Sequence, residues 1–337
     1  MTAARAPRVS FAMACHSYGR YLGAALDSIL AQRDCEVEVI VIDDGSIDET
    51  ATVLRRYRGD PRVRAVRHET AMGHLPSNNE GLALARGEFV GVFDADDYLL
   101  RPDALARKIA VFDGHPRVGL VYSAYALVDE NDRPFRLFRP WPRDYVRSGL
   151  EEFPHLINAC YIPHSSTLVR RSCHVRPDAV YDLALTHSGD WDIWLRISAR
   201  FDVGYIADTL QAYRQHGSQH STRGTSPHTA TTQLLRTIDK AFAALDPADA
   251  RRLAPLRRPA ITNALLHQSR TDRSLGRTRR AWVGLLDSCR RSPRLLASPQ
   301  LYWSAARLAA LTVLGSAQYA RVVSTRDRIA GGKGAVA

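Results

Sequence analysis

Three carboxylates follow one apolar segment, at the point where its predicted strand ends. Residues 87–97 read GEFVGVFDADD, which places Asp94, Asp96 and Asp97 within four positions. Unpaired carboxylates are costly to bury, so such a cluster needs cations beside it. Hard oxygen ligands suit Mg²⁺ or Mn²⁺, and Mg²⁺ commonly bridges protein carboxylates to substrate phosphates. The same acids could instead form a solvated turn or cap a helix beginning after Pro102.

Strand-like and helix-like segments alternate over the first third of the chain, and these elements must position the three acids. Repeated βα units predict an α/β fold, with a mostly parallel sheet flanked by helices on both faces. Ser46 and Glu49 predict a capping box at the start of the second helix. The expected strands are 8–14, 37–42, 63–67 and 88–93, and the expected helices are 21–32, 46–57 and 76–85.

Polar clusters follow three of these strands, at 14–18, 43–46 and 94–97. Ligands of such sheets bind beyond the carboxyl ends of the strands, so the three clusters predict one site.

The second half of the chain changes character. We expect strands at 118–123, 164–170 and 203–206, a helix at 191–200 and a loop at 133–149. The Ser-, Thr-, Gly- and His-rich segment 217–232 indicates a mobile loop or a boundary, with 217–228 as a lid. Helical patterns follow at 232–245, 248–270, 277–290 and 301–323. The sequence therefore predicts a sheet domain (1–225), a C-terminal α-helical extension (226–330) and a disordered tail (331–337).

Composition narrows the function classes. A hydrophobic content of 45% excludes a disordered chain, and the net charge of +11 is carried mainly by arginine. Basic chains bind nucleic acid, anionic lipid or phosphorylated substrates, but no zinc-ligand spacing or aromatic–basic RNA motif is present, which argues against nucleic acid. Five scattered cysteines indicate reduced thiols, and no apolar run reaches about 18 residues. We expect a cytoplasmic protein without a signal peptide.

Five motifs, in order, resemble the inverting glycosyltransferases of family 2, which have the GT-A fold. The resemblance covers roughly residues 8–220. The motifs are VSFAMACHSYGRYL (9–22), VIDDGSID (41–48), NNEGLALARGEFV (78–90) leading into DADD (94–97), SGDWDIWLR (188–196) and YRQH (213–216). Many family members have Glu-Asp where this chain has Gly189-Asp190, and Ala14 and His16 replace the more common residues of the first loop.

The resemblance implies binding of a nucleotide-diphosphate sugar, with a UDP-sugar favoured. Asp44 would accept the N–H of a uracil-like base, although it could equally close an Asx turn. Asn78 would contact nucleotide or phosphate, although an amide at a helix start often caps it. The implied donor site comprises Ala14, His16, Asp44, Asn78, Asp94, Ala95 and Asp96. The implied ligands of Mn²⁺ or Mg²⁺ are Asp96, Asp94 and His216.

The resemblance also implies that Asp190 is the general base, since a base must reach the acceptor hydroxyl on the face opposite the leaving group. Asp192 is the local rival, about 200° away around a helix. Asp190 could alternatively be an N-cap. Trp191 and Trp194 share a helix face and are expected to pack in the core.

The arm and the acceptor leave alternatives open. Paired arginines beside apolar stripes would suit a peripheral contact with an anionic membrane at its inner face, or packing on neighbouring helices or on a second copy in a homo-oligomer. The expected acceptor is a glycan, a lipid-linked sugar or another hydroxyl in cell-surface glycan synthesis. The alternatives are a sugar-nucleotide-binding scaffold, or a nucleotidyltransferase, for which the glycine-rich phosphate loop is missing.

Overall fold

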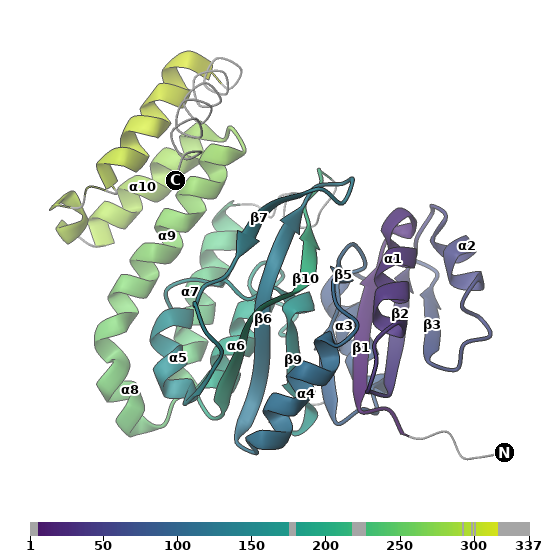
Figure 1. Ribbon diagram of the computed structural model, residues 1–337. Coiled ribbons are helices and arrows are strands. Elements are labelled where there is room, and N and C mark those ends of the chain that lie inside the picture. Colours follow the sequence, from purple (N-terminus) through teal and green to yellow (C-terminus); the bar gives the residue numbers. More distant parts are fainter. Residues whose placement is uncertain are drawn as a thin grey trace, which may run out of the picture.

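A ten-stranded mixed sheet runs through the molecule, with helices against both faces (Figure 1). The computed structural model describes residues 6–174, 180–217, 227–291, 293–297, 299 and 301–315. The strands are β1 (Val9–Cys15), β2 (Val37–Asp44), β3 (Val63–His68), β4 (Phe89–Val92), β5 (Tyr98–Leu99), β6 (Val118–Val128), β7 (Pro134–Phe138), β8 (Tyr145–Arg147), β9 (Thr167–Arg170) and β10 (Asp202–Arg214). The helices are α1 (Gly19–Leu30), α2 (Thr50–Arg55), α3 (His74–Leu84), α4 (Ala104–Gly114), α5 (Gly149–Leu156), α6 (Gly189–Ser198), α7 (Pro227–Ala243), α8 (Pro247–Leu253), α9 (Arg257–Ser274) and α10 (Thr278–Arg291), and residues 301–315 are also helical.

Most strands of the sheet run in one direction, and its main order is β3-β2-β1-β4-β9-β6-β10-β5. The first four of these strands are parallel, with Val9 of β1 opposite Val37 of β2. β9 is antiparallel to both of its neighbours, and β6 pairs in parallel with β10. The predicted α/β fold is confirmed, and the carboxyl ends of β1, β2 and β4 meet at one edge.

Two cores lie on opposite faces of the sheet because side chains alternate along each strand. Phe11 and Met13 of β1 face the core formed with α1 and α4. Ala12 faces the other core, which α3, α5, α6, α7 and α9 complete. A Cβ on Gly81 of α3 would lie 2.7 Å from the Cβ of Ala12, so this glycine lets α3 lie close over β1.

Two local predictions are wrong. The predicted loop 133–149 contains β7 and β8, because the long strands β6 and β10 offer them edges to pair with. The predicted capping box is absent from α2, whose Thr50 N–H is accepted by Asp48 (3.0 Å). A capping box forms instead at α5, which the sequence analysis did not predict, between Ser148 and Glu151.

The C-terminal arm, here residues 227–315, packs on the sheet domain and on itself. Ile238 of α7 and Ala260 of α9 are buried in the same core as α6. A smaller core inside the arm includes Leu285 of α10 and Leu308. The predicted lid falls largely on residues 218–226, which lie outside the described residues, as does the predicted tail.

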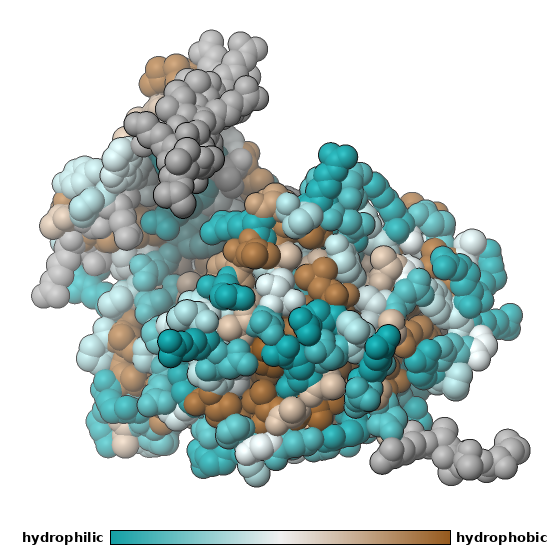
Figure 2. Space-filling view, in the orientation of Figure 1, coloured by the Kyte–Doolittle hydropathy of each residue, from teal (hydrophilic) through white to brown (hydrophobic). Residues whose placement is uncertain are grey.

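One face of the molecule shows how polar and apolar residues are distributed on the surface. Figure 2 shows a face that is mostly hydrophilic, with hydrophobic residues exposed in several places, one of them on the arm. No helix among the described residues is both long enough and apolar enough to cross a membrane.

Candidate functional site

A cleft of about 430 Å³ opens at the carboxyl ends of β1, β2 and β4. The cleft brings together every residue predicted to contact the donor, along with the predicted base. Its lining includes Ala14, His16, Asp44, Asn78, Asp94, Ala95, Asp96 and Asp190. His216 lies beside this lining, in contact with Asp96.

Hydrogen bonds join the loop after β1 to the loop after β2. Ser46 Oγ accepts the N–H of Ser17 (2.9 Å), and Asp48 accepts the N–H of Gly19 at the start of α1 (2.8 Å). His16 Nδ1 lies 2.6 Å from the carbonyl oxygen of Asp44. The first loop therefore has a fixed position beside the second.

Asp44 has its carboxylate largely occupied by its own chain. It accepts the N–H of Met72 and of Gly73, both at 2.8 Å, and contacts His68 Nδ1 at 2.7 Å. Burial opposes ionisation, but the hydrogen bonds from His68, Met72 and Gly73 outweigh it and hold the pKa of Asp44 below its ordinary value. Gly73, with φ +100°, allows the chain to turn into α3 there. Asp44 thus orders the cleft wall between β3 and α3.

Asn78 lines the cleft and carries an unpaired side-chain acceptor. It lies in the second turn of α3, and the N-cap position belongs to Gly73, so Asn78 is not a cap. The side chain is 3% exposed, and its Oδ1 has no hydrogen-bond partner among the described residues. A buried, unpaired carbonyl oxygen in a cleft wall is the expected state of a group that awaits a ligand.

Asp94 and Asp96 stand at the end of β4, on opposite sides of Ala95. The N–H of Asp94 donates to Ser165 Oγ (3.1 Å), and its carboxylate lies 3.9 Å from His164. Asp96 contacts His216 Nε2 at 3.0 Å. His216 is 9% exposed, and its ring also packs against Tyr18 and Tyr21, so it is held beside Asp96 at the cleft wall.

Negative charge is concentrated at this edge. Enclosure by the protein, followed by repulsion from Asp96 and Asp190, raises the pKa of Asp94 to about 6. A cation would relieve that repulsion, and carboxylate oxygens are the donors that Mg²⁺ and Mn²⁺ prefer. Within the described parts of the chain, no three His, Cys, Asp or Glu residues are arranged to hold a metal by themselves. The donor set therefore fits a divalent ion that takes its remaining ligands from substrate or water.

Asp97, the third acid of the cluster, is structural. It is buried, it accepts the N–H of Arg214 at 2.9 Å, and the Arg214 guanidinium donates to the carbonyl oxygen of Asp96 at 2.7 Å. Burial and the neighbouring carboxylates raise the pKa of Asp97 well above its ordinary value. Asp97 and Arg214 hold the turn that presents Asp96.

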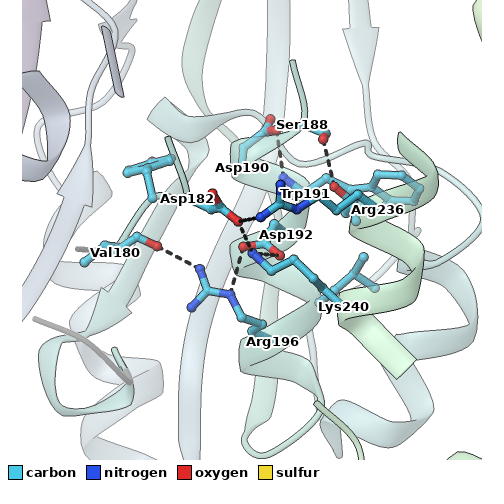
Figure 3. A network of polar contacts seen from close by, with 12 residues as sticks. Val180, Asp182, Ser188, Asp190, Trp191, Asp192, Arg196, Arg236 and Lys240 are labelled. Atoms are coloured by element: carbon cyan, nitrogen blue, oxygen red, sulfur yellow. Dashed lines mark hydrogen bonds and ion pairs between the residues drawn. The ribbon is translucent and has the colours of Figure 1, made fainter. Parts of the chain in front are cut away.

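The two acids of α6 face different surroundings (Figure 3). Asp192 is 1% exposed and forms ion pairs with Arg196 (2.9 Å) and Lys240 (3.0 Å). Asp190 lines the cleft, where one carboxylate oxygen accepts the N–H of Trp191 (2.7 Å) and the other lies 3.6 Å from Cys160 Sγ. Only Asp190 presents its carboxylate to the cleft.

Helix α7 of the arm holds the segment leading to Asp190. Gln233 accepts the N–H of His187 (2.7 Å) and donates to Thr186 Oγ1 (3.0 Å). Ser188 Oγ lies 2.8 Å from Thr237 Oγ1. The arm therefore positions the predicted base.

The predicted core positions of two tryptophans are confirmed. Trp191 and Trp194 are each 3% exposed, and they donate to the carbonyl oxygens of Leu156 (2.6 Å) and Ile162 (3.0 Å).

Several cleft residues escaped the sequence analysis. His164 was assigned to a strand, but it begins a 3₁₀ turn, η1 (His164–Ser166), that carries the Ser165 contact to Asp94. Cys160 contacts Asp190, and Gln268 and Arg277 of the arm line the cleft. No local pattern marks these residues, because distant segments bring them to the site.

Residues 10–174 match the family described as Glycosyl transferase family 2. The chain is 26% identical to an uncharacterised glycosyltransferase of Methanocaldococcus jannaschii over 214 residues, covering 62% of this chain and 71% of that one. It is 26% identical to a chondroitin synthase of Escherichia coli over 198 residues, covering 58% of this chain and 27% of that one. An uncharacterised protein of Mycobacterium tuberculosis is 27% identical over 208 residues, and the match spans 60% of this chain and 57% of that relative.

Solved structures share the fold across most of the chain, arm included. The structure of S. aureus TarS 1–349 in complex with UDP-GlcNAc superposes with a TM-score of 0.64 at 17% identity, covering 92% of each chain. A mannosyltransferase from Pyrobaculum calidifontis in complex with GDP-Man and Mn²⁺ gives a TM-score of 0.52 at 18% identity, covering 97% of this chain and 81% of that one. At these identities the likeness concerns the fold.

Proposed function

We propose that this chain, which matches glycosyl transferase family 2 over residues 10–174 and has the GT-A fold, moves a sugar from a nucleotide-diphosphate sugar to a hydroxyl acceptor, with inversion. One observation carries the proposal. Asp94 and Asp96 after β4, Asp190 on α6, and the loops after β1 and β2 line one cleft, although they lie far apart in the sequence.

The donor half of the cleft lies at β1, β2, β4 and α3. The unpaired Asn78 Oδ1 offers an acceptor to a nucleotide, and Asp44 holds the wall beside it. Matched structures hold UDP-GlcNAc, UDP or GDP-Man, which supports this class of donor, and we favour a UDP-sugar. We propose that Asp94 and Asp96, supported by His216, hold Mn²⁺ or Mg²⁺, which when bound neutralises charge on the departing diphosphate.

Asp190 serves as the general base in this proposal. It takes the proton of the acceptor hydroxyl while that oxygen bonds to the anomeric carbon. The bond from this carbon to the diphosphate breaks, and its electron pair leaves with the diphosphate oxygen. The Trp191 N–H donates to one carboxylate oxygen, and the other oxygen, 3.6 Å from Cys160 Sγ, accepts the proton.

Substitution of Asp190 by Asn tests this role. We expect UDP release from the preferred UDP-sugar, in the presence of an acceptor panel and Mn²⁺, to fall by about 10²–10⁴-fold, the usual contribution of a general base. The Kd of UDP should stay within about twofold, because Asp190 touches the acceptor. Asp96→Asn should instead weaken Mn²⁺-dependent UDP binding.

A matched control is Asp34→Asn, since Asp34 is exposed and adopts a positive φ that asparagine tolerates. It should behave as the unaltered chain. Unchanged turnover in Asp190→Asn, with donor still bound, would reject this base. The cytoplasmic location, a membrane contact, a homo-oligomer and a role in cell-surface glycans stay predictions.

A further inference from the structure

The cleft extends beyond the donor half onto the C-terminal arm. Gln268 and Thr271 of α9, together with Leu275 and Arg277 between α9 and α10, line the same cleft as Asp190. Figure 1 shows α9 and α10 on the opposite side of the molecule from β1 and β2, with α6 and α7 between them. The arm therefore forms part of the cleft wall, on the side away from β1 and β2.

Polar groups in this arm wall are arranged around one buried carboxylate. Gln268 is 6% exposed, and its Nε2 donates to Asp272 Oδ2 at 3.2 Å. This contact orients the amide and leaves Gln268 Oε1 without a hydrogen-bond partner among the described residues. Burying an unpaired amide oxygen is unfavourable unless a ligand donates to it.

Arg277 places a positive charge at the same wall. Its guanidinium lies 3.8 Å from Asp272 Oδ1, which is too far for a hydrogen bond, and the side chain keeps 30% of its surface exposed. Arg277 directly precedes α10, so the positive end of that helix dipole adds to its charge. A guanidinium of this kind can bind a phosphate or carboxylate through two parallel hydrogen bonds.

Charge is divided unevenly along the chain. Residues 1–226 contain 27 Arg and Lys against 29 Asp and Glu, whereas residues 227–337 contain 19 against 6. The whole net charge of +11 thus arises from the arm side. A field of this sign attracts an anionic ligand toward the arm.

Resting on the function proposed above, we infer that the arm reads the acceptor, and that this acceptor carries an anionic group. Arg277 binds a phosphate or carboxylate of the acceptor, and Gln268 Oε1 accepts a hydrogen bond from one of its hydroxyls. The acceptor hydroxyl is thereby held toward Asp190.

Direct binding of small probes to the full chain, saturated with UDP and MnCl₂, tests this inference. Glycerol 3-phosphate and methyl glucuronide supply the phosphate and the carboxylate, and glycerol and methyl glucoside are their neutral counterparts. Isothermal titration calorimetry should show binding of at least one anionic probe and of neither neutral one. Arg277→Gln should weaken that binding by about tenfold or more, as expected for loss of a charged hydrogen bond.

Arg280→Gln is the matched control, because Arg280 is exposed on α10 and does not line the cleft; it should change the Kd by less than twofold. Equal binding of neutral and anionic probes, or no effect of Arg277→Gln, would overturn the inference. A weaker Kd for UDP in Arg277→Gln would assign the guanidinium to the donor instead. Binding to anionic lipid vesicles without binding of either anionic probe would assign the basic arm to a membrane surface, and would also overturn it.

The probe titration needs no turnover, so it is independent of the Asp190 experiment. Loss of the glycosyl-transfer proposal would leave the Arg277 result standing as a binding site, and loss of the Arg277 result would leave the transfer proposal intact.

Discussion

Individual side chains of the same type have different tasks here because their surroundings differ. Asp97 and Asp192 are buried against cationic or backbone partners, while Asp94, Asp96 and Asp190 line the cleft. Proximity in sequence says little about this division, since Asp96 and Asp97 are adjacent and Asp190 and Asp192 share a helix turn.

Substitution of Asp192 by Asn should affect stability before chemistry. The change leaves Arg196 and Lys240 without their buried counter-ion, and breaking a buried pair costs about 3–5 kcal/mol. Because both cations keep some exposure, we expect a loss near the lower end, about 3 kcal/mol in the free energy of unfolding measured with urea. Asp190→Asn should change this quantity by less than about 1 kcal/mol. A stable Asp192→Asn chain without turnover would show that Asp192, and not Asp190, is the general base.

At the scale of elements, helix α4 contacts the turn η1, which in turn contacts Asp94. Lys108 of α4 is 1% exposed, and its ammonium group donates to the carbonyl oxygen of Ser166 in η1 (2.7 Å). The same turn accepts the N–H of Asp94 through Ser165. Helix α4, which was not part of the predicted site, therefore helps to position Asp94 through η1.

Lys108 also predicts a dependence of stability on pH. Burial lowers its pKa to about 7 in the folded chain, whereas an unfolded lysine has a pKa near 10.4. Between these values the unfolded state binds more protons, so this group makes folding more favourable as pH rises from about 7 to 10. The free energy of unfolding should rise more steeply over this range in the natural chain than in Lys108→Met, by at most about 1.4 kcal/mol per pH unit. Parallel curves for the two chains would show that Lys108 is solvated.

At the scale of the whole molecule, the arm and the sheet share a core. Phe153 of α5 and Trp194 of α6 pack in the same cluster as Ile238 of α7 and Ala260 of α9. The sequence suggested a boundary near residue 225, and the chain does change composition there, but helices on both sides of that point bury one another. We therefore propose that the two regions unfold together.

Ile238→Ala tests this coupling. Ile238 is fully buried, so the truncation should cost about 2–4 kcal/mol and lower the midpoint of the same transition that releases UDP. Leu285→Ala removes a comparable side chain from the arm's own small core and should leave UDP binding unchanged. Two separate transitions in Ile238→Ala, with UDP retained through the first, would show an independently folding arm.

The sequence by itself determined the donor edge. Buried strands followed by polar residues predicted where β1, β2 and β4 end, and parallel strands joined by helices must end at one edge. This constraint brought Ala14, Asp44 and Asp94 into one cleft without any knowledge of packing. The same local patterns missed β7, which returns along β6 after a short turn, and β8, which pairs with β10 later in the chain.

Tertiary structure decided which acid of α6 faces the cleft and what stands across from it. The motif resemblance favoured Asp190, and the structure shows how the two acids differ: Asp192 is ion-paired with Arg196 and Lys240, whereas Asp190 lines the cleft. Gln268 and Arg277 reach the cleft because α7 and α9 pack on the sheet domain, and such contacts depend on the shapes of surfaces distant in sequence. Periodicity reports how a segment buries its own face, and it carries no information about which other face will cover it.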